Sequence, residues 1–221
     1  MLTKYQEARH EVRDAVLHAV QVLADVNKEA LNALEVSNAG DLEASRTKLK
    51  GLAKVTEKID NDIVLIFARY TPEAKDLREM VSYLKITSAI NRIKTNINNY
   101  LKNMQSMLAE EDANIVQFIK DSLSINRCTI NAFNKTLEMF TTFDDNDKIK
   151  QLAIEIDVEY AKTDDIYAVL EKSVVQKMGE AEGKAEEYFN LLKYFRKNLK
   201  IIDRLDSMAQ RVIFARMGGK L

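Results

Sequence analysis

Apolar residues recur every three or four positions along almost the whole chain. In the first segment this stripe comprises Val12, Ala15, Val16, Ala19, Val20, Leu23, Val26, Ala30 and Leu34. A spacing of three and four places side chains on one face of a helix, so the pattern is typical of amphipathic helices. Read to the end, it predicts six long helices, over about residues 4–36, 41–70, 72–108, 112–140, 148–178 and 183–217.

The breaks between these stripes are short and chemically distinct. Ser37–Gly40 ends the first stripe, and Asp41 is the predicted N-cap of the second helix. Pro72, the only proline, cannot continue a helix, because it has no N–H and its ring clashes with the preceding turn. We therefore expect a hairpin with Thr71 as N-cap and Pro72 at the first helical position. Gly179 is the predicted end of the fifth helix.

The strongest polar break divides the chain into two similar halves. Glu110–Asp112 separates three predicted helices from three more, and the acidic run 144–147 is a turn inside the second set. Ile90–Ile93 on the third helix corresponds to Ile202–Leu205 on the sixth. Each half alone would expose an apolar stripe. We therefore predict an all-α protein of two three-helix repeats, residues 1–108 and 109–221, packed side by side.

Composition agrees with long helices and excludes several classes of protein. Six glycines and one proline in 221 residues are too few for a β-rich fold. A net charge of −1 offers no general attraction for nucleic acid. The longest apolar run, Ile63–Ala68, is too short to cross a bilayer, and the charged N-terminus does not resemble a signal peptide. With a single cysteine, Cys128, these features favour the cytoplasm.

One polar row on the third predicted helix is unusual. Beside its apolar stripe run four uncharged polar residues, Ser88, Asn91, Thr95 and Asn98. Exposed helix faces normally carry charges. This row is therefore either a buried polar seam or the rim of a site.

The hairpin at Pro72 carries a resemblance to a known family. The matching residues are Ala68-Arg69, Pro72, Ala74, Asp76-Leu77-Arg78, Lys85 and Arg92-Ile93. In this order and spacing they resemble the PhoU family of phosphate-homeostasis regulators. The resemblance implies a bundle of two three-helix repeats in which acidic residues on the inner helices can bind iron or another hard divalent cation.

The acidic positions implied by the resemblance are kept unequally. In the first half Asp60 matches one, but Asn91, Thr95 and Asn98 stand where the family has acids. Hard cations need carboxylate oxygens, so we expect no tight metal there.

In the second half the matching acids are Asp157, Asp203 and Asp206. Asp203 and Asp206 are three residues apart and share a helix face. These three carboxylates are the predicted cation ligands. The alternative is that they are solvated or paired with Lys200 and Arg204.

The sequence shows few residues in patterns typical of an enzyme active site. Both histidines, His10 and His18, belong to the first predicted helix, which argues against a serine or cysteine triad, and no glycine-rich phosphate loop is present. The resemblance instead implies a regulator that lowers phosphate uptake and phosphate-starvation signalling through protein contacts. Its implied partners are the ATPase of a phosphate ABC transporter and a phosphate-sensing histidine kinase, and we expect a homodimer. Two alternatives remain: a relative of the PhoU-like domains of sodium–phosphate cotransporters, or a helical carboxylate metal-binding protein.

Overall fold

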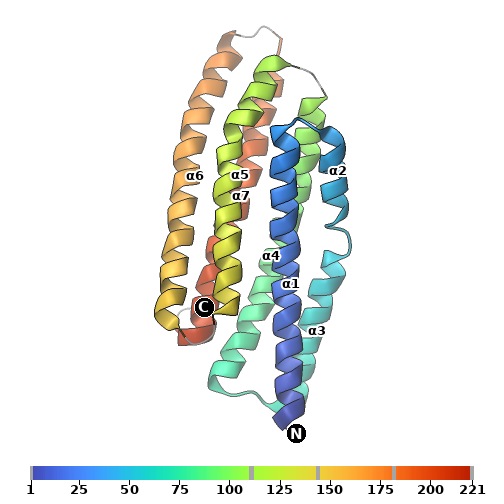
Figure 1. Ribbon diagram of the computed structural model, residues 1–221, viewed down its shortest axis with the longest axis vertical. Coiled ribbons are helices and arrows are strands. Elements are labelled where there is room, and N and C mark those ends of the chain that lie inside the picture. The colour runs from blue at the N-terminus through green and yellow to red at the C-terminus, as the bar shows by residue number, and fades with distance from the viewer. Residues whose placement is uncertain (1, 110–111, 143–144, 181–182, 220–221) are drawn as a thin grey trace.

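The computed structural model describes residues 2–109, 112–142, 145–180 and 183–219. These residues form helices and contain no strand. The helices are α1 (Leu2–Glu35), α2 (Ala39–Thr47), α3 (Leu52–Tyr70), α4 (Ala74–Leu108), α5 (Ala113–Thr141), α6 (Asn146–Glu180) and α7 (Ala185–Met217). They form an elongated bundle in which α2 and α3 run in the same direction and the other consecutive helices are antiparallel, with one unit, α1–α4, on one side and a second unit, α5–α7, on the other (Figure 1). The predicted all-α helical bundle is confirmed, and the seventh helix arises because the second predicted helix is divided into α2 and α3.

The two units share one continuous apolar core. Between them the main packing is α4 against α7, supported by α1 against α5. Fully buried residues such as Ile86, Ile90 and Ile93 on α4 belong to the same core as Ile201, Ile202 and Leu205 on α7. Burial of such side chains contributes about 1.5–3 kcal/mol each. Because the core crosses the boundary near residue 109, neither unit exposes its inner stripe.

The second predicted helix is interrupted, which the apolar pattern did not show. Residues 48–51 form a turn between α2 and α3, with i→i−3 backbone hydrogen bonds from Lys48, Leu49 and Lys50. Gly51 follows with φ = 90°, a left-handed conformation that glycine adopts without steric cost. Leu49 and Leu52 stay buried on either side, so the stripe continues although the helix does not.

The helix ends at the first two breaks also differ from the prediction. Asn38, not Asp41, caps α2, because its side chain accepts hydrogen bonds from the N–H groups of Gly40 and Asp41. At the hairpin, Thr71 ends α3 in a left-handed conformation (φ = 45°), and extended Glu73 precedes α4. Pro72 therefore lies between the helices instead of opening the second one.

In the second half the acidic break provides a helix cap, and the predicted glycine stop is wrong. Asp112 accepts hydrogen bonds from the N–H groups of Asn114 and Ile115, but Glu110, Glu111 and Asp144 lie outside the described residues. Gly179 is inside α6, which continues to Glu180, so its predicted role as the helix end is wrong. The left-handed glycine of this connection is Gly183 (φ = 77°).

A buried ionic network ties α1 to the start of α4. Arg9 lies 2.9 Å from Asp76 and also contacts Glu79, while Tyr5 donates to Asp76 and Tyr83 donates to Glu79. Burial by itself would raise the pKa of Glu79, but the hydrogen bond and charge of Arg9 outweigh it and hold that pKa below its ordinary value. Removing Arg9 would leave a buried carboxylate without its cation.

We predict that Arg9→Met lowers the free energy of unfolding by about 3 kcal/mol, since a buried carboxylate then loses its partner. Arg127→Met is the matched control. It breaks an ion pair with Glu35 in which both side chains are largely exposed, and it should cost less than about 1 kcal/mol. Urea unfolding measures both. Equal losses of unfolding free energy in the two variants would contradict the claim that the buried ion pair contributes more than the exposed one.

Candidate functional site: a cationic groove between the two halves

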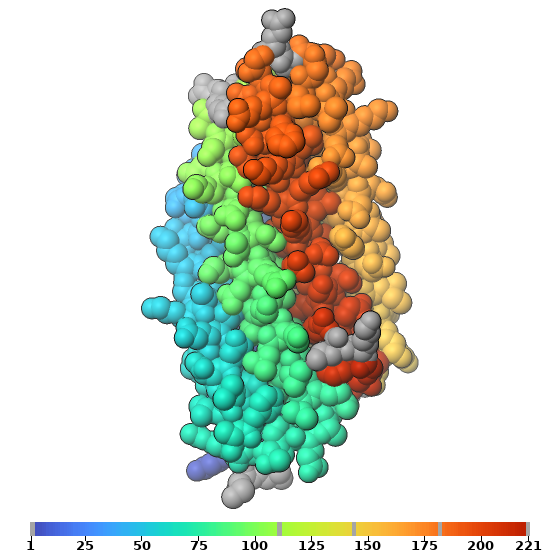
Figure 2. All heavy atoms as spheres, turned by 180° about the vertical axis from the view of Figure 1, so that it is seen from behind, coloured from blue at the N-terminus to red at the C-terminus, as the bar shows by residue number. Residues whose placement is uncertain are grey.

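A hollow lies where α4 meets α7. It has a volume of about 660 Å³, and a second hollow of about 230 Å³ continues it toward the C-terminal end of α7. The two share Ser88, Arg92 and Arg204, so they form one groove, which we call the α4/α7 groove. Figure 2 shows α4 and α7 side by side along this face of the molecule.

The floor of the α4/α7 groove contains the uncharged polar row seen in the sequence. Ser88, Asn91 and Thr95 are among the residues that line this hollow. Asn91 donates to the Thr56 hydroxyl at 2.8 Å and thereby holds α3 against α4. Asn98 lies one turn further on, in a neighbouring hollow, where its side-chain oxygen accepts from Arg46.

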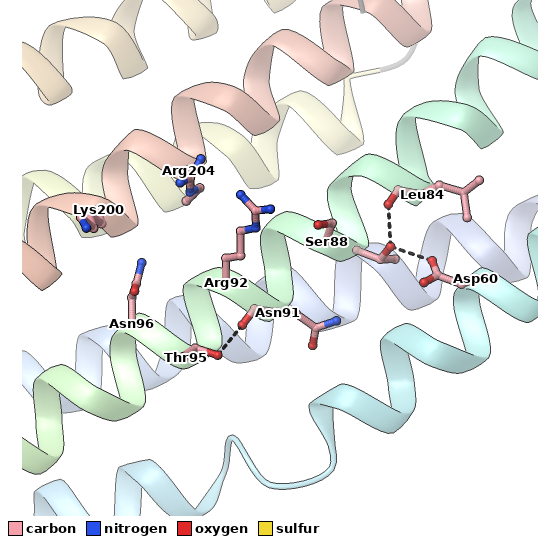
Figure 3. Close-up of a pocket in the computed structure, with 10 residues that line it drawn as sticks. Asp60, Leu84, Ser88, Asn91, Arg92, Thr95, Asn96, Lys200 and Arg204 are labelled. Atoms are coloured by element: carbon pink, nitrogen blue, oxygen red, sulfur yellow. Dashed lines mark hydrogen bonds between the residues drawn. The ribbon is translucent and has the colours of Figure 1, made fainter.

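Asp60 is the single carboxylate among the residues that line the groove. Its side chain accepts a hydrogen bond from the Thr87 hydroxyl at 2.6 Å (Figure 3). Thr87 also donates to the Leu84 carbonyl within α4, so it is held between two acceptors. The first-half acid is thus a hydrogen-bond acceptor between α3 and α4.

Basic side chains dominate the groove. Its lining contains Lys85, Arg92, Lys200, Arg204 and Arg211, which are five cations against the one carboxylate of Asp60. In Figure 3, Arg92 extends from α4 toward α7, where Lys200 and Arg204 lie. In the sequence, Arg92 and Arg204 belong to the two repeat motifs, and the only role predicted for either is pairing of Arg204 with the second-half acids. The spacing of basic residues along α7 was a usable signal, but nothing in the sequence showed that α4 faces it.

The predicted second-half acids lie on α6 and α7. Asp157 is exposed on α6, and Asp203 and Asp206 are half-buried on α7. Burial, with the charges of Asp157 and Asp203, raises the pKa of Asp206 above its ordinary value, even though Gln210 donates a hydrogen bond to it. The structure therefore brings the three acids close enough to repel one another.

No described group of three or more His, Cys, Asp or Glu side chains has an arrangement that could hold a metal ion. The neighbouring Glu159, which is buried, interacts with Cys128, Asn131 and Lys162. Glu159 thus links α6 to α5 through its contacts with Cys128 and Asn131. The cation site at Asp157, Asp203 and Asp206 stays a prediction.

The fold and the groove define a helical-bundle protein with a polar inter-repeat surface, and comparisons with known proteins give its family. Residues 10–104 match the model of the PhoU domain. The crystal structure of PhoU from Pseudomonas aeruginosa is similar over 97% of this chain and 100% of that one, with a TM-score of 0.77 and 20% identity.

A second solved structure agrees with the first. The phosphate transport system regulatory protein PhoU from Streptococcus pneumoniae is similar over 98% of this chain and 99% of that one, with a TM-score of 0.71 and 17% identity. A search of curated proteins finds no match. The resemblance read from the hairpin is thus confirmed: residues 10–104 match the PhoU domain, and almost the whole chain has the fold of the two PhoU structures.

We predict that Asp206→Asn raises the free energy of unfolding at pH 7 by roughly 0.5 kcal/mol, because it removes a like charge. A carboxyl whose pKa is raised in the folded state costs stability above that pKa, and the cost disappears below the ordinary value of 3.8. The gain should therefore vanish as the pH falls below that value. Asp165→Asn, at an exposed position of α6, is the control and should change little. Denaturant unfolding at several pH values measures this, and a gain independent of pH would contradict it.

Proposed function

We propose that this chain is a regulator of phosphate homeostasis that lowers phosphate uptake and phosphate-starvation signalling through contacts with other proteins. The observation that carries the proposal is the PhoU domain over residues 10–104, within a chain that has the PhoU fold along its whole length. The PhoU of S. pneumoniae is described as a phosphate transport system regulatory protein, and the proposal extends that role to this chain.

The outer surface of the second unit supports action by protein contact. Large apolar side chains stand exposed on α6 and at the start of α7, namely Ile154 (64% exposed), Val158 (47%), Val169 (68%), Val175 (46%) and Phe189 (61%). Exposed apolar side chains of this size can contribute to a surface that binds another protein. We propose as partners the ATPase of a phosphate ABC transporter, a phosphate-sensing histidine kinase, or a second copy of this chain.

Regulation is preferred to catalysis for a chemical reason. The α4/α7 groove offers guanidinium, ammonium, amide and hydroxyl groups, and its one carboxylate is already hydrogen-bonded to Thr87. No histidine or cysteine is part of this lining, so it lacks a serine–histidine or cysteine–histidine pair. None of the described helices combines the length and apolar character required to cross a lipid bilayer. We place the regulator in the cytoplasm, beside the membrane proteins that it would control.

We expect deletion of the gene to raise phosphate uptake, or expression of phosphate-starvation genes, in phosphate-rich medium. Complementation with Asp60→Ala should restore regulation, because among the described groups the Asp60 carboxylate accepts a hydrogen bond only from Thr87. Ile154→Gln combined with Val158→Gln should restore it poorly, because it makes the exposed apolar surface of α6 polar. Phosphate uptake and reporter expression in each strain are the measurements. Unchanged values in the deletion strain at both high and low phosphate would end the phosphate-regulator proposal.

A further inference from the structure

The cations of the α4/α7 groove are largely without neutralising partners. Lys85, Arg92, Lys200 and Arg211 form no ion pair or hydrogen bond with any part of the chain that the structure describes. Arg204 has one weak contact, 3.8 Å from Asp203 on its own helix. Elsewhere, arginines such as Arg9, Arg46 and Arg196 are paired with carboxylates. The groove therefore concentrates positive charge on a chain whose net charge is −1.

The five cations are arranged in a line. Because α4 and α7 are antiparallel, Lys85 and Arg211 line one end of the groove, Arg92 and Arg204 its middle, and Lys200 the other end. The lining on α4 extends from residue 84 to residue 96, which corresponds to about 18 Å of helix at a rise of 1.5 Å per residue. At the middle, two guanidinium groups and the Ser88 hydroxyl line both hollows, and Ser207 adds a second hydroxyl beside them.

We propose that the α4/α7 groove binds an anion that carries two or more phosphate groups. A guanidinium presents paired N–H donors that match two oxygens of one phosphate, and the Ser88 hydroxyl can donate to a remaining oxygen, whereas the Ser207 hydroxyl donates to the Asp203 carbonyl. One phosphate would bind between Arg92 and Arg204. A second would then reach Lys200 in one direction, or Lys85 and Arg211 in the other.

The lining favours a small polyanion over an acidic protein segment. A protein partner is normally anchored by buried aromatic or large apolar side chains at the centre of its interface. The described lining contains no aromatic residue, and its apolar members are only Leu84, Ala89 and Met208. Positive charge and hydrogen-bond donors are thus what the groove presents to a ligand. Anion binding is inferred from the residues of the groove alone. A role of that binding in regulation rests on the proposed function.

The position of the groove gives such binding a consequence for the fold. The anion would contact α4 of the first unit and α7 of the second, so it would crosslink the two halves at their main interface. It would also remove the mutual repulsion of the cations, which is strongest at low ionic strength. Binding should therefore raise the melting temperature.

The test is calorimetric titration of the full chain with sodium tripolyphosphate, pyrophosphate and inorganic phosphate, with sulfate as a comparison anion. We expect tripolyphosphate to bind more tightly than inorganic phosphate or sulfate, and its affinity to fall with added salt. The double variant Arg92→Gln and Arg204→Gln should raise the tripolyphosphate Kd at least about tenfold. Both residues are at the surface and glutamine suits a helix, so circular dichroism should show an unchanged fold.

The control double variant is Lys102→Gln and Lys172→Gln, which removes the same charge from exposed positions of α4 and α6 that line neither hollow. It should bind tripolyphosphate as the unmodified chain does. The proposal is overturned if no phosphate anion binds, if both double variants weaken binding equally, or if a glutamate-rich peptide binds in the groove and tripolyphosphate does not. These outcomes are independent of the deletion phenotype. Anion binding by the groove can therefore be disproved while the phosphate-regulator proposal holds, and the regulator proposal can be disproved while anion binding holds.

Discussion

The paired burial of Arg9 and Glu79 is the constraint on which the arrangement of the first unit depends. A carboxylate in a helical core is tolerated only beside a cation, so α1 must approach the first turns of α4 in one register. Asp76 accepts from the same arginine, and Arg78 lies against the C-terminal end of α7 at Gly218. The Asp-Leu-Arg segment that carries the family resemblance thus connects α4 to both neighbours. These contacts of Asp76 and Arg78 favour one orientation of α4 about its axis relative to α7.

Most of the fold could be predicted from the helical period of apolar residues, and the exceptions have local causes. The interruption at residues 48–51 was missed because Leu49 and Leu52 keep the apolar stripe while Gly51 changes the backbone. At the hairpin, the chain uses a left-handed Thr71 to reverse direction before Pro72. That choice depends on how α3 and α4 pack, which local preferences do not determine.

The site was less predictable than the fold. The polar row of α4 is visible in the sequence, since uncharged side chains at helical spacing contrast with the charged faces elsewhere. The cations that complete the groove come from residues more than one hundred positions apart, such as Arg92 and Arg204. Periodicity gives the face of each helix but not its neighbour in space. Only the packing of α4 against α7 shows that the two motif arginines line the same hollow.

The uncharged motif residues of the first repeat and the charge of the groove have a common physical explanation. Carboxylates at Asn91 and Thr95 would lie in the same lining as Arg92, Lys200 and Arg204 and would neutralise them. Amide and hydroxyl groups keep the hydrogen bonds, as Asn91 does with Thr56, but leave the field of the cations intact. On α7, the remaining acids Asp203 and Asp206 lie close to Asp157 of α6, while Arg204 lines the groove beside α4. The motif positions of the second repeat therefore place acids beside α6 and an arginine beside α4, whereas those on α4 of the first repeat place an arginine and no acid in the groove.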